Sequence, residues 1–229
     1  MKYLSLYIIF IITGLFSVQI TGQQIPDYNK IGSEIADENS DLYYPKLFGR
    51  YIIADRELTV EDFRYLYYGF SFQNVYNPYA DSEYRQNLAV YYKKKEITKT
   101  DRVQMIKYAN LILKAFPFDL RALQILDYAY YHNKDYEKSY DAEFKRKMII
   151  KAIMSTGNGL MKKSGIHLID DSHKFDLLTE KGLRYNGQKQ LSNNVCEYLG
   201  VFENDKNISG LYFNVSRLYE VSAQRLKGN

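Results

Sequence analysis

The chain has 229 residues, and its 31 lysine and arginine side chains slightly outnumber its 27 aspartate and glutamate side chains, for a net charge of +4. The sequence also lacks the glycine-and-aromatic signature of many nucleic-acid-binding modules. With so small a positive excess, we do not expect nucleic acid as a partner. The single cysteine, Cys196, excludes a disulfide within the chain. Tyrosine is the main compositional excess, with 24 tyrosines beside 12 phenylalanines and no tryptophan.

The first 22 residues have the pattern of a secretory signal peptide. Lys2 supplies the positive charge, residues 3–18 are mainly apolar, and the small Gly22 precedes Gln23 at the expected cleavage point. A membrane anchor is the alternative, but a spanning helix needs roughly 20 apolar residues and this segment is shorter. We therefore expect an exported protein of the periplasm or cell surface, with no transmembrane segment after cleavage. Because exported eukaryotic domains usually carry paired cysteines, the lone thiol favours a bacterial protein.

Residues 23–156 are predicted to form a helical array, because start and stop signals recur between apolar residues at helical spacing. One helix is expected within Tyr43–Ala54. Thr59 opens the next helix as an N-cap, with Asp62 completing a capping box, and Asn77-Pro78 is expected to end it. Later helices are expected from Asp81 or Ser82 and from Thr98 or Thr100.

The stretch from Phe63 to Tyr79 is dense in aromatic rings. On a helix starting at Thr59 it gives two apolar stripes, so we expect a central packing helix that is buried on two sides. Tyr76 and Tyr79 fall on a turn beyond that helix, where binding residues tend to lie. The stripes consist of Val60, Phe63, Leu66, Tyr67 and Phe70 on one side and Tyr65, Tyr68 and Phe72 on the other.

The segment Asn110–Lys138 resembles one tetratricopeptide unit. Pro117 closes one helix, Asp119 caps the next, and a tight turn at residues 133–135 leads to a third helix. Small alanines within the unit let paired helices approach closely, as tetratricopeptide helices do. Because no regular repeat of roughly 34 residues accompanies this unit, we predict a tetratricopeptide-like helical array rather than a regular repeat protein.

After a glycine-rich junction at residues 157–165, residues 166–229 switch to the alternating pattern of strands. We predict a small antiparallel β-sheet packed with the helices as one unit, so the fold class is α+β and mainly α. Asn186-Gly187 is expected to form the type I′ turn of a hairpin. Residues 217–227 fit either a short helix or a strand. The strands are expected at residues 166–170, 183–185, 188–190, 195–203 and 211–216.

Three segments resemble a family of uncharacterised exported proteins from Bacteroidetes: YYPKLFGRY (43–51), LTVEDFRYLYYGFSF (58–72) and YNPY (76–79). That family is known as a domain of unknown function about 200 residues long, within the range of one domain. The resemblance spans nearly the whole mature chain and implies a single-domain periplasmic or surface protein of that phylum. It implies no activity and no catalytic residues.

Sequence motifs for catalysis and cofactors, such as HExxH, GxSxG and a phosphate loop, do not occur, so no cofactor or metal is expected. The best catalytic candidates are Asp170, Asp171 and His173, which bring carboxylate and imidazole beside the hydroxyl of Ser172. The alternative is structural: Asp171 or Ser172 caps a short helix over residues 174–181, which Gly182 ends. The sequence thus leans away from an enzyme.

The leading functional hypothesis is a non-catalytic helical-array module that binds a peptide or protein partner in the cell envelope. One alternative is a hydrolase acting on envelope glycan or peptide through Asp170, Asp171 and His173. A second alternative is glycan binding, because exposed aromatic rings stack on sugars, although the absence of tryptophan counts against it. The candidate rings for that alternative are Tyr65, Tyr68, Tyr76 and Tyr79.

Overall fold

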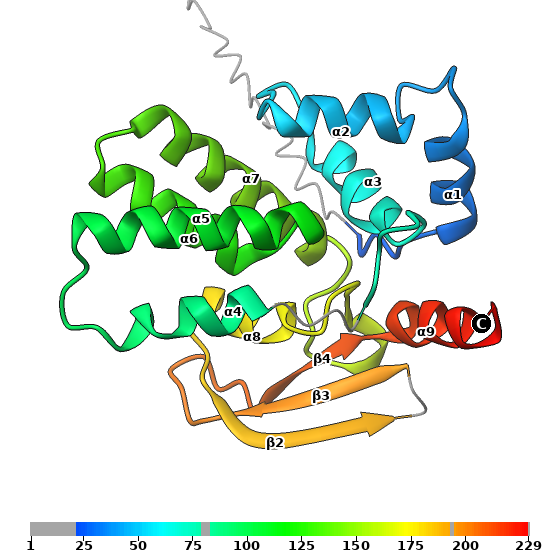
Figure 1. Ribbon diagram of the computed structural model, residues 1–229. Helices are drawn as coiled ribbons and strands as arrows, with labels where there is room; N and C mark the ends of the chain where they lie inside the picture. The colour runs from blue at the N-terminus through cyan, green and yellow to red at the C-terminus, as the bar shows by residue number, and fades with distance from the viewer. Residues whose placement is uncertain (1–21, 79–82, 193–194, 229) are drawn as a thin grey trace, which may run out of the picture.

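The computed structural model describes residues 22–78, 83–192 and 195–228. Within these ranges the chain is an α+β structure, rich in helix, with a four-stranded mixed sheet near its C-terminus (Figure 1). Except for Gly22, the predicted signal peptide lies outside the described residues, as do Tyr79 and the two candidate helix starts Asp81 and Ser82. Among the described helices, none is long and apolar enough to cross a membrane.

Seven α-helices of the described residues precede the sheet, and their start signals are largely those expected from the sequence. Thr59 and Asp62 form the predicted capping box, in which the Asp62 backbone N–H donates to Thr59 Oγ1 at 3.2 Å. Thr98 begins its helix with the same arrangement, and Asp119 accepts a hydrogen bond from the Ala122 backbone N–H at 2.8 Å. The helices are α1 (Tyr28–Ala36), α2 (Tyr44–Ile52), α3 (Val60–Phe70), α4 (Glu83–Ala89), α5 (Lys99–Ala115), α6 (Leu120–His132) and α7 (Tyr136–Met154).

Helix α3 is the centre of the helical part, as expected, but it ends earlier than predicted. Every residue from Phe63 to Phe70 is buried, and α3 contacts α1, α2 and α7. The helix stops at Phe70 rather than at Asn77-Pro78, because both the backbone N–H and the hydroxyl of Ser71 bond the carbonyl of Tyr68. These i→i−3 bonds tighten and close the last turn. Phe72, which was assigned to the second apolar stripe, lies beyond the helix and is 40% exposed.

The sheet is mixed, which corrects the prediction of an antiparallel sheet. Its order is β1-β4-β3-β2, with β1 parallel to β4 and the other neighbours antiparallel. Helix α8 (His173–Glu180) follows β1 and carries the chain away before β2, so β1 joins the opposite edge beside β4. The strands are β1 (Ile166–His167), β2 (Tyr185–Ser192), β3 (Cys196–Val201) and β4 (Gly210–Asn214).

Asn186-Gly187 forms an irregularity inside β2 and not the predicted hairpin turn. The strand continues from Tyr185 to Ser192, and its register with β3 shifts between Tyr185 and Lys189. Gly187 has a φ of +94°, and Asn186 Oδ1 accepts a hydrogen bond from the Gln188 backbone N–H at 2.9 Å. A β-bulge needs such backbone freedom as much as a tight turn does, and the local sequence does not distinguish the two.

The last segment is a helix, α9 (Ser216–Gly228), which resolves the choice left open for residues 217–227. Asn214 Oδ1 begins it by accepting hydrogen bonds from the backbone N–H and hydroxyl of Ser216. The guanidinium of Arg217 then lies between two rings, 4.6 Å from the centre of Tyr28 and 4.3 Å from that of Phe72. These contacts fix α9 against α1 and the end of α3.

One continuous hydrophobic core joins the helices to the sheet. It includes Phe63, Tyr67 and Phe118 from the helical part and Leu199 and Phe213 from the strands. A second cluster lies between α4, α5, α6 and α7, where Ala109, Ala122 and Ala142 are buried and allow close helix packing. Sheet and helices therefore cover each other, as a sheet with one apolar face requires.

His167 in β1 makes the fold sensitive to acid. Burial lowers the pKa of its imidazole from 6.5 to about 4, and the charge of Arg64 acts in the same direction. The unfolded chain therefore takes up this proton near pH 6.5, whereas the folded chain takes it up only near pH 4. The contribution of His167 to the free energy of unfolding is thus fully present above pH 6.5 and is lost as the pH falls toward 4.

We expect His167→Gln to remove this part of the acid sensitivity, which amounts to about 2 kcal/mol after screening of a half-buried group. Urea unfolding at pH 7 and near pH 4.5 measures it. The wild-type protein should lose more stability between the two conditions than the variant does, and equal losses would show that His167 has no such role.

Candidate functional site

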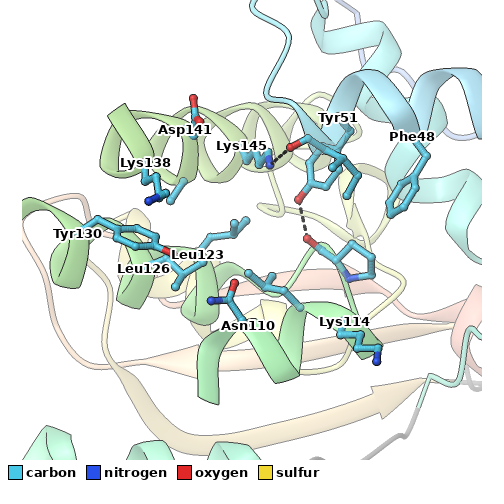
Figure 2. Close-up of a pocket in the computed structure, with 14 residues that line it drawn as sticks. Phe48, Tyr51, Asn110, Lys114, Leu123, Leu126, Tyr130, Lys138, Asp141 and Lys145 are labelled. Atoms are coloured by element: carbon cyan, nitrogen blue, oxygen red, sulfur yellow. Dashed lines mark hydrogen bonds between the residues drawn. The ribbon is translucent and has the colours of Figure 1, made fainter. Parts of the chain in front are cut away.

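The helical part contains a cleft between α2, α5, α6 and α7 (Figure 2). Its volume is about 480 Å³, within the usual range of ligand pockets. Its walls come from helices that lie far apart in the sequence, from α2 to α7. The lining residues are Phe48, Tyr51, Ile52, Asn110, Leu113, Lys114, Pro117, Leu123, Leu126, Tyr130, Lys138, Asp141, Ala142 and Lys145.

Two hydrogen bonds hold α2 at the edge of the cleft (Figure 2). The Tyr51 hydroxyl donates to the carbonyl of Pro117 at 2.5 Å, which ties α2 to the connection between α5 and α6. Lys145 Nζ on α7 donates to the carbonyl of Ile52 at 2.8 Å, at the last residue of α2. Because Pro117 lies between α5 and α6, outside both helices, its carbonyl is not used by an intrahelical bond and can accept this one.

The floor of the cleft is apolar and its rim is mainly basic. Leu123 and Leu126 lie on the floor and are almost fully buried. Three lysines, Lys114, Lys138 and Lys145, line the cleft with one acid, Asp141. A cleft of this kind favours a ligand that has an apolar group next to a negatively charged group.

Two of the charged side chains that line the cleft, Asp141 and Lys138, already have ion-pair partners outside the lining. Arg56 Nη2 lies 2.6 Å from Asp141 Oδ1, so the acid is already paired from outside the cleft. Lys138 Nζ lies 2.6 Å from Asp135 Oδ2. Burial lowers the pKa of the Lys145 ammonium, and the nearby charge of Asp141 opposes this while that of Arg56 adds to it.

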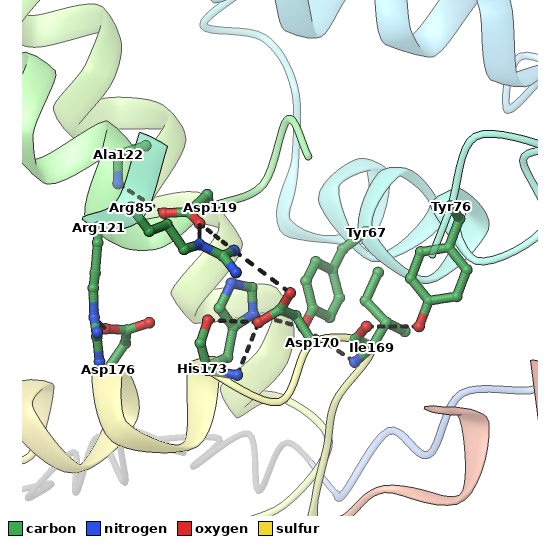
Figure 3. Close-up of polar contacts among 11 residues, drawn as sticks. Tyr67, Tyr76, Arg85, Asp119, Arg121, Ala122, Ile169, Asp170, His173 and Asp176 are labelled. Atoms are coloured by element: carbon green, nitrogen blue, oxygen red, sulfur yellow. Dashed lines mark hydrogen bonds and ion pairs between the residues drawn. The ribbon is translucent and has the colours of Figure 1, made fainter. Parts of the chain in front are cut away.

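The three acid–base candidates from the sequence have different partners in the structure (Figure 3). His173 is 0% exposed, and its Nδ1 lies 2.8 Å from the hydroxyl of Tyr67. Asp170 accepts hydrogen bonds from the backbone N–H and hydroxyl of Ser172, and Asp171 pairs with Lys174. The fold therefore does not bring the three side chains to one point. Ser172 occupies the N-cap position of α8, as predicted, but its side chain bonds Asp170 and makes no capping bond to the helix.

The surroundings of His173 are a packed polar network below α4 and α6 (Figure 3). Arg85 on α4 pairs with Asp119 at 2.6 Å, and its guanidinium lies 3.9 Å from Asp170. Arg121 on α6 pairs with Asp176 on α8, also at 2.6 Å. Burial raises the pKa of the Asp176 carboxyl, and the nearby positive charges only partly offset this. The network joins helices to the segment that links β1 and α8.

The tyrosines suggested for glycan binding are buried wherever the structure describes them. Tyr76 was expected on an accessible turn, but it is 1% exposed and its hydroxyl donates to the Ile169 carbonyl at 2.6 Å (Figure 3). Tyr65 and Tyr68 are buried in α3, and the Tyr68 hydroxyl donates to the His167 carbonyl at 3.0 Å. Tyr79 lies outside the described residues. These three enclosed rings leave no open face on which a sugar could stack.

The cleft residues were not singled out from the sequence. Each lysine falls within a helix that contains other charged residues, and each lining leucine falls on an ordinary apolar stripe. The only local signal was the tetratricopeptide-like segment Asn110–Lys138, which supplies α6, the end of α5 and the start of α7. Among the described residues, no group of three or more His, Cys, Asp or Glu side chains is placed to hold a metal ion.

A family model described as a domain of unknown function (DUF4919) matches residues 29–224, which covers most of the chain. No curated protein and no solved structure matches the chain. The matched range includes nearly all of α1, the helices α2 to α8, the sheet and most of α9. The chain therefore belongs to this family of domains of unknown function, DUF4919.

Proposed function

We propose that the protein is an exported, non-catalytic helical module of the bacterial cell envelope, and that its cleft between α2, α5, α6 and α7 binds a short peptide segment of a protein partner. The observation that carries the proposal is the cleft itself, a hollow of about 480 Å³ with an apolar floor and a basic rim. Such a volume accommodates a few side chains of an extended or helical peptide.

The arrangement of α5, α6 and α7 supports a tetratricopeptide-like array. The three helices follow one another in sequence and pack in order, α5 on α6 and α6 on α7. The turn between α6 and α7 is short, and Lys134 within it has a φ of +65°. Helical arrays of this type present a concave surface made by several helices, which is where such proteins bind extended partners.

The proposed export rests on the sequence of residues 1–22, with cleavage after Gly22 and a mature chain that starts at Gln23. This location sets the class of partner, because the ligand must be a protein segment exposed in the periplasm or at the cell surface. Intact-mass measurement of the protein from an envelope fraction tests the cleavage. A chain that still carries residues 1–22 would contradict it.

The binding proposal predicts that filling the cleft strongly weakens peptide binding. Asn110 is exposed, lies on α5 and points into the cleft (Figure 2). We expect Asn110→Trp to weaken binding at least about tenfold, because a buried ring of this size occupies most of the space for a ligand side chain. The measurement is fluorescence anisotropy of short labelled peptides that carry a Leu-Phe pair flanked by Asp, by Asn or by Lys.

The matched control is Gln124→Trp, which places the same ring at an exposed amide on α6 outside the cleft. It should leave binding unchanged. Two results would refute the cleft as the binding site: equal effects of the two variants, or no binding of any peptide series up to about 1 mM, where affinity reaches only −4 kcal/mol.

A further inference from the structure

Lys145 occupies a special position on the wall of the cleft, opposite the end of α2 (Figure 2). Its Nζ donates to the carbonyl of Ile52 at 2.8 Å and lies 4.9 Å from the centre of the Tyr51 ring. A lysine ammonium has three donors. The bond to Ile52 fixes the position of the charge at the cleft wall and uses one of these donors, which leaves two for a ligand.

The other charged groups of the cleft do not neutralise Lys145. Asp141, the one acid of the lining, is paired with Arg56, Lys138 is paired with Asp135, and Lys114 adds positive charge at the rim. With the partners from outside the lining counted, the four cations Lys114, Lys138, Lys145 and Arg56 stand against two acids, Asp141 and Asp135. The field within the cleft is therefore positive and favours an anionic group.

The surroundings of Lys145 also strengthen its interaction with a negatively charged group. The side chain is half-buried beside Tyr51, and burial lowers the pKa of its ammonium. An ammonium that is partly removed from water has lost part of its solvation. A carboxylate that binds it therefore forms a stronger hydrogen bond than at an open surface.

The apolar floor lies beside this charge. Leu123 and Leu126 form the floor, and Phe48, half-buried, lies on the α2 side. A ligand that satisfies both surfaces has a branched or aromatic side chain next to a carboxylate. Peptides provide this combination where Leu or Phe neighbours Asp or Glu.

We infer that the cleft selects acidic peptide segments, in which a side-chain carboxylate binds Lys145 while a neighbouring Leu or Phe fills the apolar floor. This inference rests on the proposed peptide-binding function and adds the class of segment that the cleft accepts. Lys114 strengthens the selection through long-range attraction at the rim, which salt weakens. Lys145 is the specificity-determining residue.

A double-mutant cycle tests this pairing. The protein variants are wild type and Lys145→Gln, since a glutamine amide can still donate to the Ile52 carbonyl but carries no charge. The peptides are the labelled Leu-Phe peptides flanked by Asp and by Asn. The exposed Lys107 on α5, outside the cleft lining, supplies the control variant Lys107→Gln with the same change of net charge.

We expect the wild-type protein to bind the Asp peptide about tenfold more tightly than the Asn peptide, the size typical of one charged hydrogen bond. In Lys145→Gln this preference should disappear, whereas in Lys107→Gln it should persist. Loss of the preference in both variants would instead reflect net charge alone and would overturn the role of Lys145.

The outcomes separate this inference from the proposed function. If Asn110→Trp blocks binding but the Asp and Asn peptides bind equally, the cleft remains the binding site and the selection of acidic segments is refuted. If Lys145→Gln weakens both peptides to the same extent, Lys145 only supports α2 and the inference fails. If neither peptide binds, the inference falls together with the proposed function.

Discussion

Replacing Lys174 with methionine is expected to lower the free energy of unfolding by about 3–5 kcal/mol. Lys174 in α8 is 0% exposed, and its ammonium bonds the carboxylates of both Asp171 and Glu197. Glu197 on β3 is only 2% exposed and has one further partner, Lys189, at 3.1 Å. Without Lys174, the Glu197 carboxylate is left buried with too little compensation, and this costs more than the pair itself contributes.

Urea unfolding at pH 7 measures the loss, and two further variants identify its cause. Lys163→Met removes a charge from an exposed position and should change stability by less than about 0.5 kcal/mol. The double variant Lys174→Met/Glu197→Leu removes both buried charges and should recover most of the loss. If Lys174→Met were no more harmful than Lys163→Met, the buried ion pair would not exist as described.

Replacing Phe118 with alanine is expected to cost about 3–5 kcal/mol. The ring is 0% exposed and lies where α2, α3 and the connection between α5 and α6 meet. It contacts four other aromatic rings, at centroid distances between 5.2 and 6.1 Å from Tyr51, Tyr67, Phe70 and Phe116. Alanine would lose these contacts and leave a cavity that the rigid neighbouring rings cannot close.

Phe118→Leu is the matched variant, because it keeps most of the apolar volume and should cost less than about 2 kcal/mol. Thermal and urea unfolding of both variants give the comparison. Similar small losses for alanine and leucine would show that the cluster relaxes freely around this position, which would contradict the central role of these rings in the core.

The local features of the helices could be predicted from the sequence because short-range chemistry determines them. Thr59 and Thr98 begin their helices through bonds to residues three positions away, and Asp119 does the same. The burial of α3 on two sides followed from its two apolar stripes. The segments that form β3 and β4 could be recognised from their alternation, because the sheet buries one face more than the other.

The features that depend on distant partners could not be predicted in this way. The parallel pairing of β1 with β4 depends on the path of the chain through α8, and the sequence of β1 does not indicate its partner strand. Tyr76 looked like a residue of an open turn, but its partner is the carbonyl of Ile169, far along the chain. The cleft is the same kind of feature, since four helices must assemble before Lys145, Leu126 and Asn110 face one space.

The cleft as a peptide-binding site is tested most directly by amide NMR spectra of the mature protein, titrated with the Asp-flanked Leu-Phe peptide. We predict that the largest shift changes fall on residues of the cleft, such as Leu113, Leu126 and Tyr130, and that they vanish in Asn110→Trp but persist in Gln124→Trp. Shift changes confined to the sheet, to α9 or to the segment around His173 would contradict the account, as would a spectrum that the peptide leaves unchanged.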